Sequence, residues 1–321
     1  MNARQDQQNH VDARVGDGFG TSLLTYLPPT ANAVRRKAGS VVGRGRRAVK
    51  QLASSYVDYA ERPPVIANSF PKSGTHLLRQ LADALPATVD YGTFIASVPP
   101  IRHRPRSAHD SLRKICAIAP GELVRAHLWY SPEAVACLRR VNAVHLFIYR
   151  DLRDVAVSET HYLTEMAPWH ALHRHFARLP TMSERLMLAI RGLPPDHEGV
   201  YYPGIGRRFA AYAGWLADES VVGIRYEDLT SGDLDAELTR IAKAMNARVQ
   251  VPMEPAEFAR AARAAIDPKR SHTFRVGRVG GWRAAFGPEH CEAMLEEAGT
   301  LLVDLGYESG LDWSAQPFAR Q

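Results

Sequence analysis

Residues 65–86 read VIANSFPKSGTHLLRQLADALP, and this stretch decides the fold. Its first six residues form an apolar run between two prolines, which is typical of a buried strand. After the segment PKSGT, apolar residues recur at helical spacing up to Pro86: Leu77, Leu78, Leu81, Ala82 and Leu85. The stretch therefore predicts a strand, a tight loop and a helix in succession.

The loop of this unit has the residues of a phosphate-binding site. Backbone N–H groups at the start of a helix present partial positive charge, and Gly74 lets the backbone approach an anion closely. Lys72 adds a full charge, while Ser73 and Thr75 add hydroxyl donors. The ordinary P-loop pattern is absent, because position 67 is alanine and Lys72 precedes Gly74. We therefore expect a phosphate loop that differs from that of an ordinary ATPase.

Further strands are expected later in the chain, and helices alternate with them. The expected strands are 123–125, 143–149 and 221–225, and the expected helices are 134–140, a segment through 155–157, 234–245 and 289–305. This alternation is typical of a parallel, doubly wound sheet. We therefore expect an α/β fold with a central parallel β-sheet flanked by helices, a P-loop-like nucleotide-binding fold. From their proline, glycine and histidine content, 98–113 and 266–287 are expected as loops and 169–206 as a helical insertion.

Composition divides the chain into a basic N-terminal arm, residues 1–60, and a domain of residues 61–321. The 321 residues are 45% hydrophobic, which is enough for one large domain with a buried core. The net charge is +6, and one short segment of the arm holds basic residues without an acid: Arg35, Arg36, Lys37, Arg44, Arg46, Arg47 and Lys50. We expect a solvated, partly flexible arm, with peripheral contact to an anionic surface as the alternative. No nucleic-acid partner is expected, because aromatic residues are not interleaved with these charges.

Targeting signals and cysteines predict the compartment. No stretch approaches the roughly 20 apolar residues of a membrane-spanning helix, and the N-terminus has no apolar signal-peptide core. Cys116, Cys137 and Cys291 are odd in number, far apart and not in CxxC spacing. We therefore expect a soluble cytoplasmic protein with reduced cysteines and no zinc site.

Residues 69–75, SFPKSGT, resemble the 5′-phosphosulfate loop of the sulfotransferase family that uses 3′-phosphoadenosine 5′-phosphosulfate (PAPS). Residues 149–158, YRDLRDVAVS, are similar to the family's 3′-phosphate motif, in which an Arg and a Ser lie eight residues apart, as Arg150 and Ser158 do (158 − 150 = 8). The planar fork of an arginine suits that task, because it binds phosphate oxygens in pairs.

Two later segments resemble family motifs in the same order. Residues 225–229, RYEDL, look like the YEDL segment, and residues 274–282, FRVGRVGGW, resemble the late RKGxxGDW loop. Val276 and Gly281 depart from the family's Lys and Asp, while Arg278 is a replacement for the missing charge. The resemblance implies these nucleotide-binding residues: Lys72, Ser73, Gly74, Thr75, His76, Arg150, Ser158, Tyr226, Phe274, Arg275 and Gly277.

The resemblance also implies an in-line sulfuryl transfer with two catalytic residues. Residues 124–128, VRAHL, are similar to the KTHLP-like segment, whose His is the general base, and His127 stands 150 − 127 = 23 residues before Arg150. An imidazole with a pKa near neutrality accepts a proton readily. Lys72 would offset charge on the leaving phosphate. A structural role for His127, and His76 as the base, remain alternatives.

Adenine stacking departs from the family pattern. Many small-molecule members of the family have a Trp at the position of Leu77, and that Trp stacks on adenine. Leucine packs against a ring but stacks less well. Phe258 is the candidate for a ring supplied from elsewhere in the chain.

The function expected from this resemblance is sulfuryl transfer from PAPS to an acceptor hydroxyl or amine, without a metal. The segments 98–113 and 165–206 are expected to shape the acceptor pocket, and their Arg and His content favours a polar or anionic acceptor such as a glycan or glycolipid. A small-molecule acceptor, a phenol or an alcohol, remains an alternative. Four histidines cluster in sequence, but no acid or Cys completes an obvious metal set: His161, His170, His173 and His175. The alternatives are a P-loop small-molecule kinase and a non-catalytic nucleotide-binding relative.

Overall fold

The computed structural model describes residues 43, 45, 47–49, 56–267 and 279–315. By its internal contacts the chain divides into a unit of residues 1–42 and a unit of residues 43–321, and every described residue belongs to the second unit. Most of the expected N-terminal arm, and Phe274, Arg275 and Gly277, lie outside the described residues.

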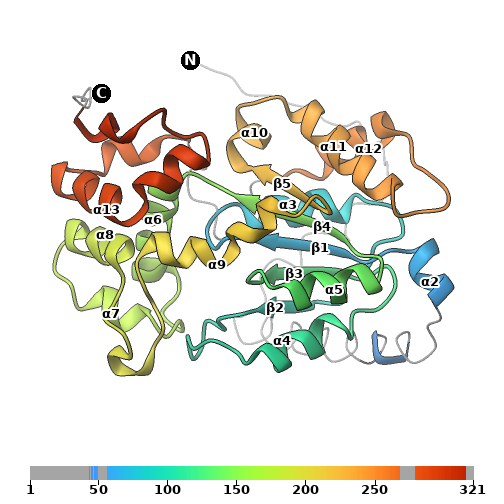
Figure 1. Cartoon of the computed structure of the whole chain (residues 1–321), viewed down its shortest axis with the longest axis horizontal. Coiled ribbons are helices and arrows are strands. Elements are labelled where there is room, and N and C mark those ends of the chain that lie inside the picture. Colours follow the sequence, from blue (N-terminus) through green and yellow to red (C-terminus); the bar gives the residue numbers. More distant parts are fainter. Residues whose placement is uncertain (1–42, 44, 46, 50–55, 268–278, 316–321) are drawn as a thin grey trace, which may run out of the picture. The chain divides into compact units, whose positions relative to one another are not determined.

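A five-stranded sheet forms the centre of the described unit (Figure 1). Its strands are β1 (Val65–Ser69), β2 (Phe94–Ala96), β3 (Leu123–His127), β4 (Val144–Tyr149) and β5 (Val221–Arg225). They lie in the order β2-β3-β1-β4-β5, and every neighbouring pair is parallel. The prediction of an α/β fold with a parallel sheet is confirmed.

The order of the strands indicates at which end of the sheet a ligand is expected to bind. From the central strand β1 the chain runs to one edge and returns through β3, then crosses to β4 and β5 on the other side. Ligands of such sheets bind at the carboxyl ends of the strands where the order reverses. That end carries the loop after β1, the end of β3 and the residue after β4.

The helices cover both faces of the sheet. They are α2 (Tyr56–Glu61), α3 (Thr75–Asp83), α4 (Ala108–Ile115), α5 (Pro132–Arg140), α6 (Leu152–His161), α7 (His173–Ala177), α8 (Met182–Arg191), α9 (Ile205–Ala217), α10 (Tyr226–Thr230), α11 (Leu234–Asn246), α12 (Pro255–Ala265) and α13 (Pro288–Asp304). Short helical turns are η1 (Tyr162–Met166), η2 (His197–Gly199), η4 (Gly281–Ala284) and η5 (Leu311–Ala315). In Figure 1, α6, α8 and α13 lie together, and these helices are in contact.

Successive residues of the strands pack alternately into two separate hydrophobic cores, one on each face of the sheet. Ile66 and Phe147 pack into the core under α5, α6, α8, α9 and α13, while Val65 and Leu146 pack into the core under α3, α10, α11 and α12. Successive side chains of a strand point to opposite faces of the sheet. Strands buried on both faces are apolar throughout, which is why these runs were recognisable in the sequence.

The expected loop at 98–113 is wrong in its second half, because α4 begins at Ala108. Ser107 caps this helix by accepting a hydrogen bond from the backbone N–H of Asp110. Ile115 is the one buried residue of α4, so its sequence carries little of the apolar period that marks a helix.

The structure also corrects the expectation of reduced cysteines. Cys116 and Cys137 are joined as a disulfide with their Cα atoms 5.6 Å apart, whereas Cys291 is free and buried. Cys116 ends α4 and Cys137 lies within α5, and these two helices pack side by side. Sequence spacing does not reveal that contact between helices.

In the part of the chain that the structure describes, the helices are too short or too polar to cross a membrane.

One basic residue of the expected arm is bound to the domain. Arg47 forms an ion pair with the buried Glu122 at 2.6 Å. This arginine is therefore held by the domain.

Candidate functional site

A cavity of about 1000 Å³ opens at the carboxyl ends of β1, β3 and β4. It brings together eight of the residues predicted for the site: Lys72, Gly74, Thr75, His76, His127, Arg150, Ser158 and Tyr226. These residues come from sequence segments up to 154 positions apart (226 − 72 = 154). The fold therefore joins the expected phosphate loop, the expected 3′-phosphate motif and the expected base in one space.

The loop after β1 has a backbone that depends on Gly74. Its φ is +102°, and a Cβ at this position would lie 2.7 Å from the ring of Tyr226. Lys72 also has a positive φ, of 66°. Since φ in this region is strained for residues other than glycine, the loop is held in shape by its surroundings.

The first turn of α3 points its amides into this loop. Gly74 is the N-cap of the helix, and as a glycine it has no side chain to accept a hydrogen bond from the first turn. The opening amides of a helix carry partial positive charge and need acceptors. An anion in the loop would provide them.

Ser73 is a buried residue of this loop that does not line the cavity, and among the described residues its Oγ has no hydrogen-bond partner. Leaving a buried hydroxyl without a partner costs about 1–3 kcal/mol. A phosphate oxygen would accept this hydrogen bond. The neighbouring hydroxyl of Thr75 instead lies 2.7 Å from Ser69 Oγ, which ties the start of α3 to the end of β1.

The ammonium group of Lys72 lies in the cavity, 3.8 Å from the centre of the Tyr162 ring. The pKa of Lys72 is lowered to about 8, chiefly by burial; the carboxylate of Glu159 raises it and the charge of Arg150 lowers it. The charged form is thus costly when the cavity holds no anion. A bound phosphosulfate would offset that cost.

Arg150 and Ser158 lie on the second side of the cavity, at the start and within α6. The guanidinium of Arg150 stacks over the ring of Tyr226 at 4.4 Å and forms an ion pair with Asp154 at 3.2 Å. Arg150 is only 8% exposed. A cation fixed in this way is suited to bind a phosphate.

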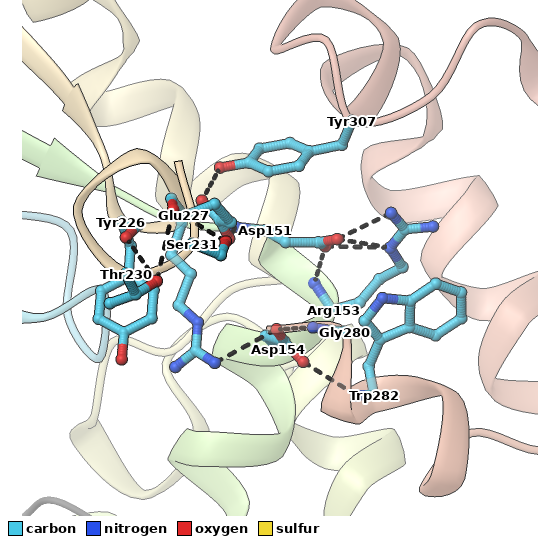
Figure 2. A network of polar contacts seen from close by, with 11 residues as sticks. Asp151, Arg153, Asp154, Tyr226, Glu227, Thr230, Ser231, Gly280, Trp282 and Tyr307 are labelled. Atoms are coloured by element: carbon cyan, nitrogen blue, oxygen red, sulfur yellow. Dashed lines mark hydrogen bonds and ion pairs between the residues drawn. The ribbon is translucent and has the colours of Figure 1, made fainter. Parts of the chain in front are cut away.

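Asp154 connects this side of the cavity to the end of the motif at residues 274–282. Its carboxylate accepts hydrogen bonds from the backbone N–H groups of Gly280 and Trp282, both at 2.9 Å (Figure 2). Burial raises the pKa of Asp154, and the charge of Arg150 lowers it. The described end of this segment, residues 279–282, is therefore anchored beside Arg150.

Residues that the sequence reasoning missed hold α6 in place. Arg153 is bound by Asp151 and Glu308, and its guanidinium lies 4.0 and 4.7 Å from the ring centres of Trp282 and Trp313. Figure 2 shows its contacts with Asp151 and the neighbouring ring of Trp282. A buried cation in contact with two indoles is stabilised by both. Because Glu308 and Trp313 are distant in sequence, no local pattern could have identified this group.

Glu227 ties the YEDL segment to the same helix. Its carboxylate accepts hydrogen bonds from the backbone N–H of Asp151 at 3.1 Å and from the hydroxyl of Tyr307 at 2.9 Å (Figure 2). Burial raises the pKa of Glu227. Tyr226, the preceding residue, is thereby fixed between Gly74 and Arg150.

His127 lies at the end of β3 in a defined tautomer. Its Nδ1 is 2.9 Å from the carbonyl oxygen of Ser69, and since a carbonyl only accepts, Nδ1 carries the proton. Nε2 is then the nitrogen with the free lone pair. The pKa of His127 is lowered to about 4, chiefly by burial and also by the charge of Lys72, against the hydrogen bond to Ser69. His127 is therefore neutral at pH 7, and its pKa lies below the near-neutral value expected for the base.

The remainder of the cavity is mainly aromatic. Its rings are those of Phe70, Phe94, Trp129, Tyr162, Trp169, Tyr201, Tyr202 and Tyr212. His103 and His170 also line it, and burial lowers their pKa values to about 3 and about 4, so both are neutral at pH 7. Arg208 is paired with Glu159. Arg125 lines the cavity as well, and its buried Nε has no hydrogen-bond partner among the described residues, so the aromatic lining includes one further cation.

The expected acceptor segments 98–113 and 165–206 both contribute residues to the cavity. The four clustered histidines, however, have separate surroundings. His161 pairs with Glu165, and His173 lies 2.7 Å from the carbonyl oxygen of Leu163. His170 lines the cavity, while His175 packs against His197.

Phe258 is wrong as the stacking ring. It is buried in the core with Leu78 and Ala262, where α12 packs against α3. The end of the cavity near Tyr226 is lined instead by Leu77, Leu229, Thr230, Leu234 and Ile266. Among the described residues, Tyr226 is the ring at this end.

Comparison with known proteins gives a structural likeness only. Neither the family models nor the curated proteins compared with this sequence include a match. The crystal structure of mouse sulfotransferase SULT7A1 complexed with PAP superposes with a TM-score of 0.53 at 21% identity, over 77% of this chain and 87% of that chain. The chain has the sulfotransferase fold. The geometry of the site and the likeness of the fold thus agree.

Two structures of retinol dehydratase superpose less closely, both at 16% identity and over 78% of this chain. One is in complex with androsterone and inactive cofactor PAP, with a TM-score of 0.47 and 85% of that chain covered. The other is in a complex with retinol and PAP, with a TM-score of 0.48 and 86% covered.

Proposed function

We propose that this protein is a sulfotransferase that moves a sulfuryl group from PAPS to a hydroxyl or amine of a small acceptor. The observation that carries the proposal is the single cavity that holds the loop at Lys72, the Arg150 side and His127 together, in a sulfotransferase fold. PAPS has two anionic ends, and this cavity has two cationic sides.

The residues of the cavity suit the two ends of the nucleotide. The phosphosulfate would bind at Lys72, the buried hydroxyl of Ser73 and the opening amides of α3. The 3′-phosphate would bind at Arg150 and Ser158, and the adenine against Tyr226. Arg275 and Gly277, with Phe274, are proposed to complete the 3′-phosphate site by resemblance alone. No metal is needed for this binding, because protein cations face both charges.

The transfer uses one base and one cation. His127 takes the proton of the acceptor at Nε2 while the acceptor oxygen or nitrogen forms a bond to sulfur. The bond from sulfur to the phosphate oxygen breaks at the same time, and Lys72 and the α3 amides stabilise the charge that forms on that oxygen. The products are the sulfated acceptor and adenosine 3′,5′-bisphosphate.

The lining of the cavity favours an acceptor that is small and largely apolar. Aromatic rings bind flat apolar molecules well, and the neutral His103 and His170 add hydrogen bonding without charge. A glycan or glycolipid, which the Arg and His content of the loops favours, fits this lining less well. We therefore propose a hydroxylated or amino-bearing apolar small molecule.

A thermal melt separates this function from a kinase. Adenosine 3′,5′-bisphosphate is expected to raise the melting temperature without magnesium, and more than ATP does. If instead ATP with magnesium protects better, the kinase alternative gains and the proposal fails. If the bisphosphate protects but no acceptor is sulfated, the protein is a non-catalytic relative.

A further inference from the structure

A cluster of two histidines and a glutamate lies away from the reaction cavity, between α7 and η2. His175, His197 and Glu198 each offer a ligand atom, and these atoms all lie within 4.8 Å of one another. His175 Nε2 is 4.0 Å from one carboxylate oxygen of Glu198, and His197 Nε2 is 3.9 Å from the other. The rings of the two histidines lie 5.4 Å apart.

The donor set suits a zinc ion. Two imidazole nitrogens and a carboxylate are established zinc ligands, at about 2.0–2.2 Å from the metal. Ligand atoms around one tetrahedral ion then lie about 3.4 Å from each other. Small side-chain rotations bring Glu198 from its present distances to that geometry. A fourth position is left for water.

Arg174 occupies the nitrogen of His175 that would coordinate the ion. His175 Nε2 lies 3.2 Å from Nε of Arg174, and since arginine nitrogens only donate, Nε2 is the unprotonated nitrogen and accepts this hydrogen bond. His175 is 5% exposed, so its ring is held in place by the surrounding protein. An ion must displace Arg174 before this nitrogen can coordinate it.

Two arginines now occupy the carboxylate of Glu198. Arg174 and Arg178 each lie 2.9 Å from one of its oxygens. Both guanidinium groups are more than half exposed, with side-chain accessibilities of 51% and 62%. Such surface ion pairs contribute little, about 0–1 kcal/mol. An ion that binds Glu198 can therefore displace them into solvent.

The cluster is open to solvent and close to the acceptor end. Glu198 and Arg174 line a surface cleft of about 610 Å³, which gives an ion access to the carboxylate; His175 and His197 are not part of its lining. The chain then continues to Tyr201, whose backbone N–H donates to the carbonyl of His103 at 2.7 Å, and both of these residues line the reaction cavity. An ion at this site would fix the segment 197–202 beside that cavity.

We propose that His175, His197 and Glu198 bind one Zn²⁺ ion outside the reaction cavity, with water as the fourth ligand. The sequence alone predicts no metal site, because the acid and second histidine come from a turn 22 residues after His175 (197 − 175 = 22). The site is independent of the proposed sulfuryl transfer and takes no part in its chemistry.

The test is a calorimetric titration of the untagged full chain with Zn²⁺, with visible absorption of the Co²⁺-loaded protein as a second reading. We expect one ion per chain and a melting temperature that rises with Zn²⁺. His197→Ala is expected to weaken binding at least about tenfold and to abolish the Co²⁺ bands. His109→Ala, at an exposed histidine of α4, is the matched control and is expected to bind as the wild type does.

Arg178→Gln provides a test that does not depend on removing a ligand. It takes away one of the two guanidinium groups that compete for Glu198, so Zn²⁺ is expected to bind several-fold more tightly. The proposal is overturned if the wild type binds no Zn²⁺, if His197→Ala and His109→Ala bind it equally, or if Arg178→Gln weakens the binding.

Discussion

At the scale of the residue, His127 combines position, tautomer and charge state in one side chain. The carbonyl of Ser69 fixes the proton on Nδ1, and burial keeps the ring neutral. His76, the alternative base, also lines the cavity but lies in the first turn of α3, where its backbone serves the phosphate loop. The two histidines can therefore be distinguished by substitution.

We expect His127→Ala to lower the rate of sulfuryl transfer about 10²–10⁴-fold, the usual contribution of a general base. Binding of adenosine 3′,5′-bisphosphate should stay within about threefold of the wild type, because the Ala side chain leaves both phosphate sides intact. Single-turnover kinetics and calorimetry give the two readings. His76→Ala is the control, and a larger rate loss in that variant than in His127→Ala would contradict the assignment.

The lowered pKa of Lys72 predicts how the affinity for adenosine 3′,5′-bisphosphate depends on pH. Its pKa is lowered to about 8, so the ammonium that binds the anion is present below pH 8 and is lost above it. Affinity for adenosine 3′,5′-bisphosphate should therefore fall by up to about tenfold per pH unit above 8. Lys72→Arg keeps its charge at these pH values and should give a flat profile. A wild-type affinity that does not change between pH 7 and 9 would exclude this role.

At the scale of the element, the turn from β1 into α3 decides the shape of the nucleotide site. The sequence predicts this unit because its apolar run, its glycine and its helical period are all local. Two other contacts could not be predicted in the same way, because each joins segments that are distant in sequence. They are the packing of Tyr226 against Gly74 and the hydrogen bond from the backbone N–H of Gly280 to Asp154. For the same reason the pairing of Cys116 with Cys137 was missed, and Phe258 was mistaken for a cavity residue.

Two glycines with positive φ allow a matched test of this turn. Gly74→Ala meets both backbone strain and the ring of Tyr226 at 2.7 Å, whereas a Cβ at Gly92, with φ of +81°, has no described heavy atom within 4 Å. Both variants should lose about 1–3 kcal/mol of unfolding free energy from strain. Only Gly74→Ala should also weaken nucleotide binding, by about tenfold or more. Denaturant melts and calorimetry would show it, and equal binding by both variants would count against the packing of Tyr226 on the loop.

At the scale of the whole molecule, several histidines are buried in the neutral form, and this makes stability depend on pH. His145 is the clearest case, since it lies on β4 away from the cavity, with its ring 4.4 Å from that of Trp215. Burial lowers the pKa of His145 to about 3. The unfolded chain binds a proton below about pH 6.5 while the folded chain does not, so acid favours unfolding.

Urea melts should show this effect. Between pH 7.5 and pH 5, protonation of His145 in the unfolded chain is expected to lower the unfolding free energy by about 2 kcal/mol. His145→Leu has no such protonation and should lose less stability over the same interval than the wild type. His109→Leu, at an exposed site, is the control and should behave as the wild type. An unchanged pH dependence in His145→Leu would show that His145 is not buried as the neutral ring.

The measurement that tests the central claim most directly is transfer of the labelled sulfuryl group from radiolabelled PAPS to a pool of hydroxylated and amino-bearing apolar small molecules, without metal. The account predicts a labelled acceptor with the wild type, and a rate that falls steeply in Lys72→Ala, Arg150→Ala and His127→Ala. Failure of the wild type to label any acceptor, while a kinase assay with ATP and magnesium succeeds, would contradict it.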